Sequence, residues 1–375
     1  MSGKSDVVSA LCKQCGGSFV PRNKANLFCS RECQADSRSG RPASESLSRA
    51  ETGFAWQPVV PARPVKVVVP KRKVNFVKGW RTAVIIPDQQ FGYRRFLDSL
   101  VLDPFHDPRA VSIVEQIVEV ERPDVSVMLG DLNDLPTYGK YVQEPEFVGG
   151  VQPGIDRASV HVATVSELSG RTVILKGNHD ARIENFVMQN SASSVGLRRA
   201  RRLPGEFPVL TMEFMLGISE MRNVEMIGGY PSGAFYLNDD VACIHGRITG
   251  ENLAKKVINS ERVSVIFGHV HTLVDGIQTF NRRGFPQFVR AHSPGCVCRV
   301  DGAVPSAKSG RDAFGHPMKS WENWSQGLSV VRYREDDGRF SIEHIPIQEG
   351  WAMYRGQEFV SDLAVNDPEL HIVGR

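Results

Sequence analysis

The sequence predicts an α/β protein, in which parallel strands alternate with helices, preceded by a small metal-binding module. Three observations lead to this prediction. Apolar runs rich in β-branched residues alternate with stretches of helical periodicity between residues 81 and 300. Five of these runs stop abruptly at polar residues, and the first 36 residues contain four of the seven cysteines. The 375-residue chain has the apolar and charged content of an ordinary globular protein.

The charge of the chain is unevenly distributed. Residues 1–80 contain 14 Lys or Arg and 5 Asp or Glu, a net charge of +9, whereas residues 81–375 carry −6. A basic arm on an acidic body indicates a polyanionic partner such as nucleic acid, with a solvated tail as the alternative. No stretch approaches the roughly 20 apolar residues that span a bilayer, and the amino terminus has no signal-peptide pattern. We therefore expect a cytoplasmic protein without a membrane partner.

The amino-terminal cysteines have the spacing of a zinc site. A CxxC pair and a CxxxC pair are separated by thirteen residues: Cys12, Cys15, Cys29 and Cys33. Each pair can direct two thiolates at one ion, and Gly16-Gly17 permits the tight turn of a knuckle. The stretch FCSREC at 28–33 resembles treble-clef zinc knuckles. We expect a knuckle over 8–36 with one structural Zn²⁺, the alternative being four free thiols. The other three cysteines, Cys243, Cys296 and Cys298, are attributed to packing.

Residues 37–80 have the composition of a linker. The first part is rich in Ser, Arg, Glu and Gly, and the second part separates short apolar runs with prolines that keep the chain extended. Its cations could follow a phosphate backbone, with a solvated linker as the alternative. We expect a folded domain over 81–350 and a tail over 351–375.

The folded domain begins with regularly alternating elements. Strands are predicted within the stretches 82–88, 124–134, 171–182, 240–246 and 262–272, with helices around 111–120 and 156–170. Later strand-like runs at 287–300 and 328–347 include Asp337-Gly338, a hairpin turn signal. The segment 183–240 is less regular, and its GLRRARRLP run is interpreted as a solvated face or as a wall beside the site.

Each of the five predicted strands ends in side chains that bind metals. These are Asp88 and Gln90; Asp131, Asn133 and Asp134; Asn178 and His179; His245; and His269 and His271. In open α/β sheets, ligands bind beyond the carboxyl ends of the strands. Two divalent ions could use these carboxylate, carboxamide and imidazole groups, and one shared aspartate would hold the ions about 3.5 to 4 Å apart. A lone His245 would more often be a core histidine, and Asp134 could cap a turn, but the joint order favours a two-metal site.

This order of motifs resembles that of the calcineurin-like metallophosphoesterases. The family motifs D-x-(H/Q), GDxxD, GNHD, a lone His and GHxH are matched by Asp88–Gln90, Gly130–Asp134, Gly177–Asp180, His245 and Gly268–His271. The resemblance covers about residues 81–300 and implies an αββα four-layer sandwich with two metal ions at the sheet ends. Gln90 stands where histidine is commonest in the family. Glutamine at this position is typical of phage-type members, which suggests a phage or prophage origin.

The resemblance implies a role for each matching residue. The first ion would be bound by Asp88, Gln90 and His271, the second by Asn178, His245 and His269, and Asp131 would bridge them. A hydroxide bridging the ions would attack phosphorus, while His179 would protonate the leaving oxygen. Asp180 is expected to orient His179, and Arg182 is a candidate phosphate contact. Mn²⁺ is the expected ion, with Fe²⁺ or Zn²⁺ as alternatives, because a carboxamide is a weaker and harder donor than imidazole.

Three functional hypotheses follow. The first is a metal-dependent phosphodiesterase or nuclease whose nucleic-acid substrate is bound by the knuckle and the basic arm. The second is a phosphomonoesterase acting on nucleotides or phosphoproteins, although Leu135 stands where protein phosphatases have an arginine after GDxxD. The third is a zinc-dependent nucleic-acid-binding protein whose core is catalytically weak because of Gln90.

Overall fold

The computed structural model describes residues 9–21, 26–39, 79–140, 144–200, 206–307 and 322–363. The chain divides into two units, residues 1–61 and 62–375. Almost all of the predicted linker, including its cluster of cations, lies outside the described residues. In the parts of the chain that the structure covers, no helix has the length and apolar character needed to cross a bilayer.

Six strands form the first sheet of the larger unit, in the order β15-β14-β3-β6-β7-β8. They are β3 (Arg81–Ile86), β6 (Val125–Met128), β7 (Thr172–Leu175), β8 (Val224–Ile227), β14 (Gln326–Tyr333) and β15 (Phe340–Ile347). β3, β6, β7 and β8 are parallel, whereas β14 pairs antiparallel with both β3 and β15. Gly338 adopts a φ of +70° in the turn between β14 and β15, where the sequence predicts a hairpin.

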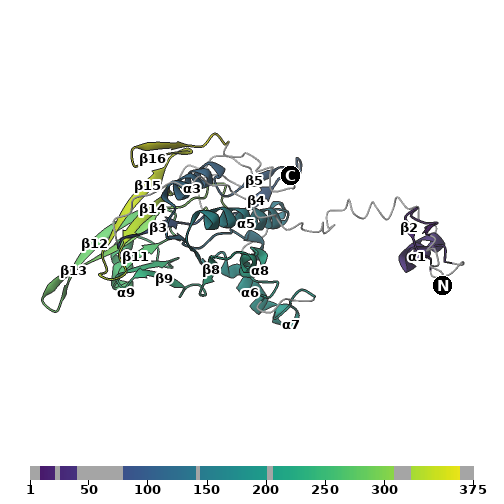
Figure 1. Ribbon diagram of the computed structural model, residues 1–375, viewed down its shortest axis with the longest axis horizontal. Helices are drawn as coiled ribbons and strands as arrows, with labels where there is room; N and C mark the ends of the chain where they lie inside the picture. The colour runs from purple at the N-terminus through teal and green to yellow at the C-terminus, as the bar shows by residue number, and fades with distance from the viewer. Residues whose placement is uncertain are drawn as a thin grey trace, which may run out of the picture. The chain divides into compact units, whose positions relative to one another are not determined.

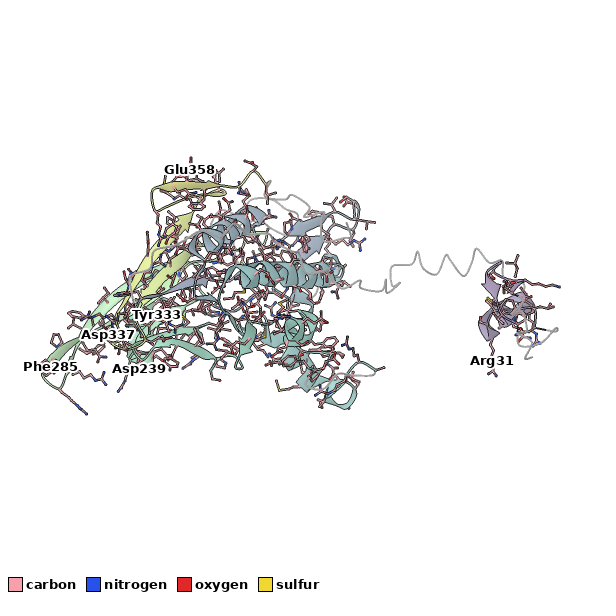
Figure 2. The ribbon with its side chains drawn as sticks, viewed as in Figure 1. Arg31, Asp239, Phe285, Tyr333, Asp337 and Glu358 are labelled. Carbon is pink, nitrogen blue, oxygen red and sulfur yellow. The ribbon has the colours of Figure 1, made fainter. Side chains whose placement is uncertain are left out.

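Five strands form the second sheet, in the order β12-β13-β11-β10-β9. They are β9 (Ala234–Asn238), β10 (Val241–Ile244), β11 (Ser264–Phe267), β12 (Leu273–Arg282) and β13 (Phe285–Pro294). β10, β11 and β13 are parallel, and the two edge strands run antiparallel to their neighbours. β12 and β13 form a long hairpin with Phe285 at its tip (Figures 1 and 2).

The side chains of the strands alternate between two apolar cores, and this alternation explains the layers. On β3, Ala83 and Ile85 face the second sheet, whereas Val84 and Ile86 face helices. Helices α3 (Pro108–Glu121) and α5 (Val151–Leu168) cover the outer face of the first sheet, and α9 (Leu253–Glu261) covers that of the second (Figure 1). The larger unit is therefore an αββα four-layer sandwich, as expected.

Short elements connect the layers. They are β4 (Tyr93–Arg95), β5 (Leu102–Pro104), α4 (Pro145–Val148), α6 (Ala181–Gln189), α7 (Ser191–Ser194), α8 (Met212–Met215) and two 3-10 turns at Pro136–Tyr138 and Ile218–Glu220. α6 begins directly after the GNHD motif, so Arg182 lies in its first turn. Before α3, the Asp107 side chain accepts hydrogen bonds from two backbone N–H groups and Pro108 opens the helix, which is a standard start signal.

The structure differs from the tail predicted over 351–375. β16 (Trp351–Tyr354) and β17 (Gln357–Val360) form an antiparallel hairpin. Its inward-facing residues Ala352, Tyr354 and Phe359 are buried and join the core beneath α3. The alternation is that of a strand with one buried face, so this hairpin belongs to the folded unit. Residues 364–375 lie outside the described residues.

A buried carboxylate connects this hairpin to the sandwich. Glu121, at the end of α3, is fully buried and accepts hydrogen bonds from Arg332 Nη2 at 2.6 Å and from the Tyr354 hydroxyl at 2.8 Å. Arg355 Nη1 lies 2.9 Å from Glu121 Oε1, the oxygen that accepts from Tyr354. We expect Glu121→Ala to lower the free energy of unfolding by about 3 kcal/mol, because it leaves the partly buried Arg332 guanidinium without its counter-charge and the buried Tyr354 hydroxyl without its acceptor.

Denaturant unfolding of Glu121→Ala beside Glu119→Ala measures this effect. Glu119 is exposed on the same helix, so its variant is expected to change stability by less than about 0.5 kcal/mol. Equal stabilities for the two variants would show that the buried carboxylate does not hold the hairpin.

The smaller unit consists of a short hairpin followed by a helix. Its elements are β1 (Ala10–Leu11), β2 (Ser18–Phe19) and α1 (Arg31–Ser39). Between β1 and β2 the chain makes a tight turn in which Gly16 has a φ of +72° and donates to the Cys12 carbonyl. The Ser30 hydroxyl accepts from the Cys33 N–H, which starts α1 at the second cysteine pair.

Candidate metal centre

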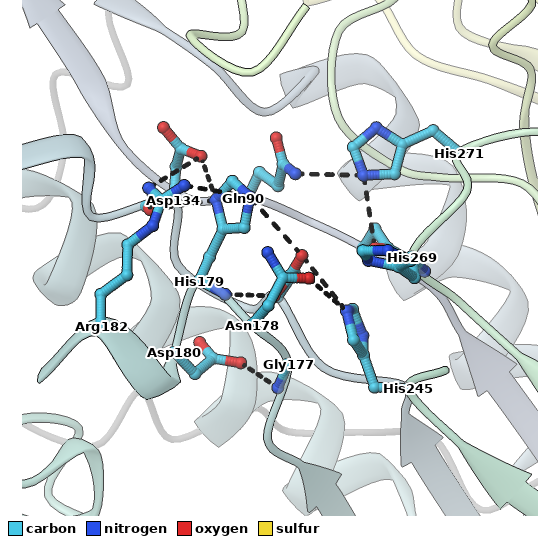
Figure 3. A network of polar contacts seen from close by, with 12 residues as sticks. Gln90, Asp134, Gly177, Asn178, His179, Asp180, Arg182, His245, His269 and His271 are labelled. Carbon is cyan, nitrogen blue, oxygen red and sulfur yellow. Dashed lines mark hydrogen bonds and ion pairs between the residues drawn. The ribbon is translucent and has the colours of Figure 1, made fainter. Parts of the chain in front are cut away.

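The polar ends of five strands meet at one edge of the two sheets (Figure 3). β3, β6 and β7 reach this edge from the first sheet, and β10 and β11 reach it from the second. The His269 N–H donates to both carboxylate oxygens of Asp88, at 2.9 and 3.0 Å. His245 Nδ1 lies 2.9 Å from the carbonyl oxygen of Leu129, at the end of β6. These contacts fasten the sheets to each other where the candidate ligands lie.

The first candidate ion site lies after β3 and β11. Ligand atoms of Asp88, Asp131 and His271 lie within 4.8 Å of one another, and all three residues are buried. Asp88 Oδ1 is 3.3 Å and Gln90 Nε2 is 3.1 Å from His271 Nε2. Among the described residues, no partner hydrogen-bonds to the buried Gln90 Oε1. A half-turn of the carboxamide would offer this oxygen to an ion, so the residues present fit a divalent cation.

The second candidate ion site lies after β7 and β10. Ligand atoms of Asp131, His245 and His269 lie within 4.8 Å of one another. Because His245 Nδ1 is directed at a carbonyl, its Nε2 faces Asp131 Oδ2 at 3.3 Å and Asn178 Oδ1 at 3.1 Å. Burial opposes a charged ring, but the Asp131 carboxylate raises the pKa of His245 to about 9. Two oxygens and one nitrogen converging in this way call for a cation, which a metal ion would supply.

Asp131 belongs to both groups. Its side chain is 1% exposed, and its Oδ1 accepts the His179 N–H at 2.7 Å. Burial disfavours the carboxylate form, but the rings of His245 and His179 hold the pKa of Asp131 well below its usual range. The position therefore carries a permanent negative charge shared by two adjacent ligand sets, which is what a pair of bridged metal ions requires.

The backbone around the candidate ligands is strained and tightly packed. Positive φ angles between 48° and 73° occur at four of the candidate ligands: Gln90, Asp131, His269 and His271. Such conformations are costly for residues other than glycine and cluster at functional sites. A Cβ on Gly177 would lie 2.0 Å from Asp131 Oδ1, and one on Gly268 would lie 2.4 Å from Asp88 Oδ2. Glycine is therefore required at both positions to admit the carboxylates.

His179 lies beside the two ligand groups and is oriented by Asp134. Its Nδ1 is 2.5 Å from Asp134 Oδ1 and 3.1 Å from the Asp134 carbonyl oxygen. Its Nε2 is 3.8 Å from Asp131 Oδ2 and accepts from Arg182 Nη2 at 3.2 Å. Burial opposes a charged ring, but the carboxylates of Asp131 and Asp134 raise the pKa of His179 above its ordinary value.

Asp180 is expected from the sequence to orient His179, but the hydrogen bonds of its carboxylate in the described structure go to the backbone. Its carboxylate instead accepts three backbone N–H groups, from Leu132 at 3.3 Å, Asn133 at 3.2 Å and Gly177 at 3.0 Å. Burial and the charge of Asp131 raise the pKa of Asp180 to about 6. Asp180 thus fixes the GDxxD loop to the GNHD loop. The sequence does mark Asp134, because it is the last aspartate of GDxxD.

The three later cysteines are buried as expected, but one of them also contacts a candidate ligand. Cys243 packs between the two sheets, and Cys296 and Cys298 lie in a smaller apolar cluster. Cys298 Sγ is 3.8 Å from His271 Nδ1, so this sulfur lies behind the ring and the Nε2 atom faces the site. Groups behind a ligating imidazole commonly fix its tautomer in this way.

The four amino-terminal cysteines form a separate cluster in the smaller unit. Their sulfur atoms lie within 4.8 Å of one another, with Cys29 Sγ 3.6 Å from Cys15 and 3.5 Å from Cys33. A tetrahedral ion with Zn–S bonds of about 2.3 Å places its sulfurs about 3.8 Å apart. Burial opposes ionisation of Cys12, but backbone N–H donors lower its pKa to about 6, whereas hydrogen bonds with the other thiols raise the pKa of Cys29 to about 12. The cluster therefore fits a thiophilic divalent ion such as Zn²⁺.

Comparison with solved structures finds distant similarity to phosphoesterase and other chains. No family model and no curated protein matches the chain. Among solved structures, it is similar to YfcE, a phosphoesterase from E. coli, with a TM-score of 0.31 and 11% identity over 71% of this chain and 100% of that chain. It is also similar to TT1561 of Thermus thermophilus, with a TM-score of 0.27 and 10% identity over 70% of this chain and 98% of that chain. Because likenesses at these TM-scores do not reveal a reaction, the function must come from the site itself.

Proposed function

We propose that the larger unit is a divalent-metal-dependent phosphoesterase that cleaves phosphodiesters of nucleic acid. One observation carries this proposal: two groups of largely buried candidate ligands share Asp131, and His179 lies against the shared carboxylate. Two adjacent cation sites suit a phosphoryl group, whose oxygens are negatively charged. An imidazole beside them suits a reaction in which a leaving oxygen must be protonated.

Two divalent ions fit the core, and the donor set guides their identity. Bound there, they would supply Lewis acidity that acidifies a water molecule and neutralises charge on the phosphoryl oxygens. Mn²⁺ is the proposed ion, because Gln90 adds a hard oxygen donor to the first group, with Fe²⁺ and Zn²⁺ as alternatives. The four-cysteine cluster of the smaller unit would bind a separate structural Zn²⁺.

The residues around His179 are arranged for proton donation. Asp134 holds Nδ1 and so directs Nε2 at the shared carboxylate. In the structure, Arg182 donates to Nε2 and also, from Nη1, to the Asp134 carbonyl oxygen at 2.5 Å. A phosphate oxygen would offer this guanidinium a charged acceptor, which would release Nε2 to face the leaving group. Arg182 is therefore the proposed phosphate contact.

The charge of the chain supports nucleic acid as the substrate. The first 80 residues carry a net charge of +9, and Lys13, Arg31 and Arg38 are exposed on the smaller unit. Phosphate contacts of this kind supply affinity without reading sequence. We propose that the amino-terminal region holds the polymer while the metal centre of the larger unit cleaves it.

Metal analysis combined with a substrate panel tests the proposed function. The purified full-length chain should cleave single-stranded DNA or RNA and an aryl phosphodiester when Mn²⁺ is supplied, and it should cleave the matching aryl phosphomonoester more slowly. A preference for the monoester would favour a phosphomonoesterase acting on nucleotides or phosphoproteins. Salt-sensitive binding without turnover, together with an incompletely loaded first ion site, would favour a nucleic-acid-binding protein instead.

A further inference from the structure

We propose that Tyr230 and Trp324 stack on nucleobases at either side of the scissile phosphate, which makes unpaired nucleic acid the substrate. This inference rests on the proposed phosphodiesterase function and deepens it. Both aromatic rings are partly exposed, and each lies against a histidine of a different ion site. No sequence motif marks either residue.

Tyr230 borders the second ion site. It lies in the loop between β8 and β9, in a turn closed by the hydrogen bond from Gly233 N–H to the Gly229 carbonyl oxygen at 3.0 Å. Its ring centroid is 5.7 Å from that of His245, with an angle of 71° between the ring planes.

Trp324 borders the first ion site. Its ring centroid is 4.3 Å from that of His271, with an angle of 70° between the planes. The next residue fixes it in place: the Ser325 N–H donates to the His271 carbonyl oxygen at 2.8 Å, and the Ser325 hydroxyl accepts from the Leu273 N–H at 2.8 Å. These backbone contacts therefore hold the partly exposed ring at this ligand.

The placement of the two rings restricts the substrate. A phosphate bound at the two ion sites that share Asp131 would have Trp324 on the side of the first site and Tyr230 on the side of the second. The two groups esterified to phosphorus would therefore each lie near one of these rings. Partly exposed aromatic rings such as these bind bases by stacking, which tolerates any base sequence. In a duplex the base faces are already stacked on each other. The rings can therefore engage only bases that are unpaired, as in single strands or dinucleotides.

Paired substrates test this inference by kinetics. A dinucleotide phosphodiester containing 2-aminopurine is compared with the same sugar-phosphate lacking both bases, for the wild type, Tyr230→Leu and Trp324→Leu. In the wild type, kcat/KM for the base-bearing compound is expected to exceed that for the abasic compound roughly 10-fold or more. Each substitution is expected to reduce this ratio. The matched controls Tyr236→Leu and Trp351→Leu remove exposed aromatic rings from β9 and β16 and should leave the ratio unchanged.

A binding measurement separates this inference from the proposed function. The fluorescence of 2-aminopurine falls when the base stacks, so it reports contact with the rings without any turnover. The His179→Ala protein is expected to quench the fluorescence of the single-stranded probe but not that of a duplex probe. Adding Tyr230→Leu or Trp324→Leu to this protein is expected to weaken the quenching of the single-stranded probe. If the wild type cleaved the base-bearing and the abasic compounds at equal rates, and no quenching were seen, the stacking inference alone would be overturned. Absence of turnover in the wild type, with quenching intact, would overturn the phosphodiesterase and retain the stacking site.

Discussion

Replacing Asp131 with asparagine is expected to remove both core metal ions and to lower phosphodiester turnover at least about 1000-fold. The carboxylate belongs to both ligand groups, and its pKa is held well below the usual range, so it is ionised at neutral pH. An asparagine has nearly the same shape but no negative charge, and each ion would lose its shared ligand. The effect should therefore exceed that of replacing any ligand that serves one ion.

Metal content and turnover measured on the same preparations check this prediction. Asp88→Asn, which alters only the first group, should retain more core metal than Asp131→Asn. Asp98→Asn removes an exposed carboxylate between β4 and β5 and serves as the control. The four-cysteine cluster provides an internal reference, because all variants should retain its ion. Full core metal content in Asp131→Asn would rule out a bridging role for this carboxylate.

The position of the metal centre could be predicted because its ligands follow strands with a strong local signal. The apolar runs before Asp88, Asp131 and Asn178 are short, β-branched and almost entirely buried, and they became β3, β6 and β7. Strand direction then brings their carboxyl ends to one edge regardless of loop detail. The sequence thus contained the fold class and the set of residues that the structure brings together.

The partner of His179 could not be predicted with the same certainty. Asp134 and Asp180 are both aspartates of the matching motifs, and which of them faces the ring depends on loop conformation. Leu135 adopts a φ of +50° directly before a 3-10 turn, which holds Asp134 beneath the imidazole. Asp180 is turned toward three backbone N–H groups of the facing loops instead. Neither conformation has a local sequence signal.

The strands that escaped prediction lack the apolar runs of the central ones. β8 is only partly buried along its length, and β12 has mostly exposed or half-buried residues because it lies at a sheet edge. The hairpin of β16 and β17 is short, and it is held by contacts of Tyr354 and Arg355 with Glu121. These residues are more than 200 positions from Glu121 in the sequence. Tertiary contacts of this kind determine such elements, and single-sequence patterns do not record them.

Replacing His179 with alanine is expected to lower kcat for an alkyl phosphodiester about 100- to 10,000-fold, as for the loss of a general acid. The loss should shrink to about 10-fold or less for an aryl ester whose leaving group is a weak base, because such a group departs without a proton. Asp134→Asn should show the same dependence on the leaving group with a smaller loss, since Asp134 holds Nδ1 at 2.5 Å.

Asp180→Asn is the matched control, because it changes a neighbouring buried carboxylate that contacts backbone N–H groups rather than the ring. It is expected to lower stability, while its relative rates on alkyl and aryl esters remain those of the wild type. The dependence of the rate on the leaving group therefore shows whether Asp134 or Asp180 supports the His179 ring. If Asp180→Asn, and not Asp134→Asn, reproduced the leaving-group dependence of His179→Ala, Asp180 would be the orienting carboxylate. If His179→Ala lowered kcat equally for both esters, the His179 ring would not act as the acid. Its role would then be to position the Asp131 carboxylate, whose Oδ2 lies 3.8 Å from Nε2.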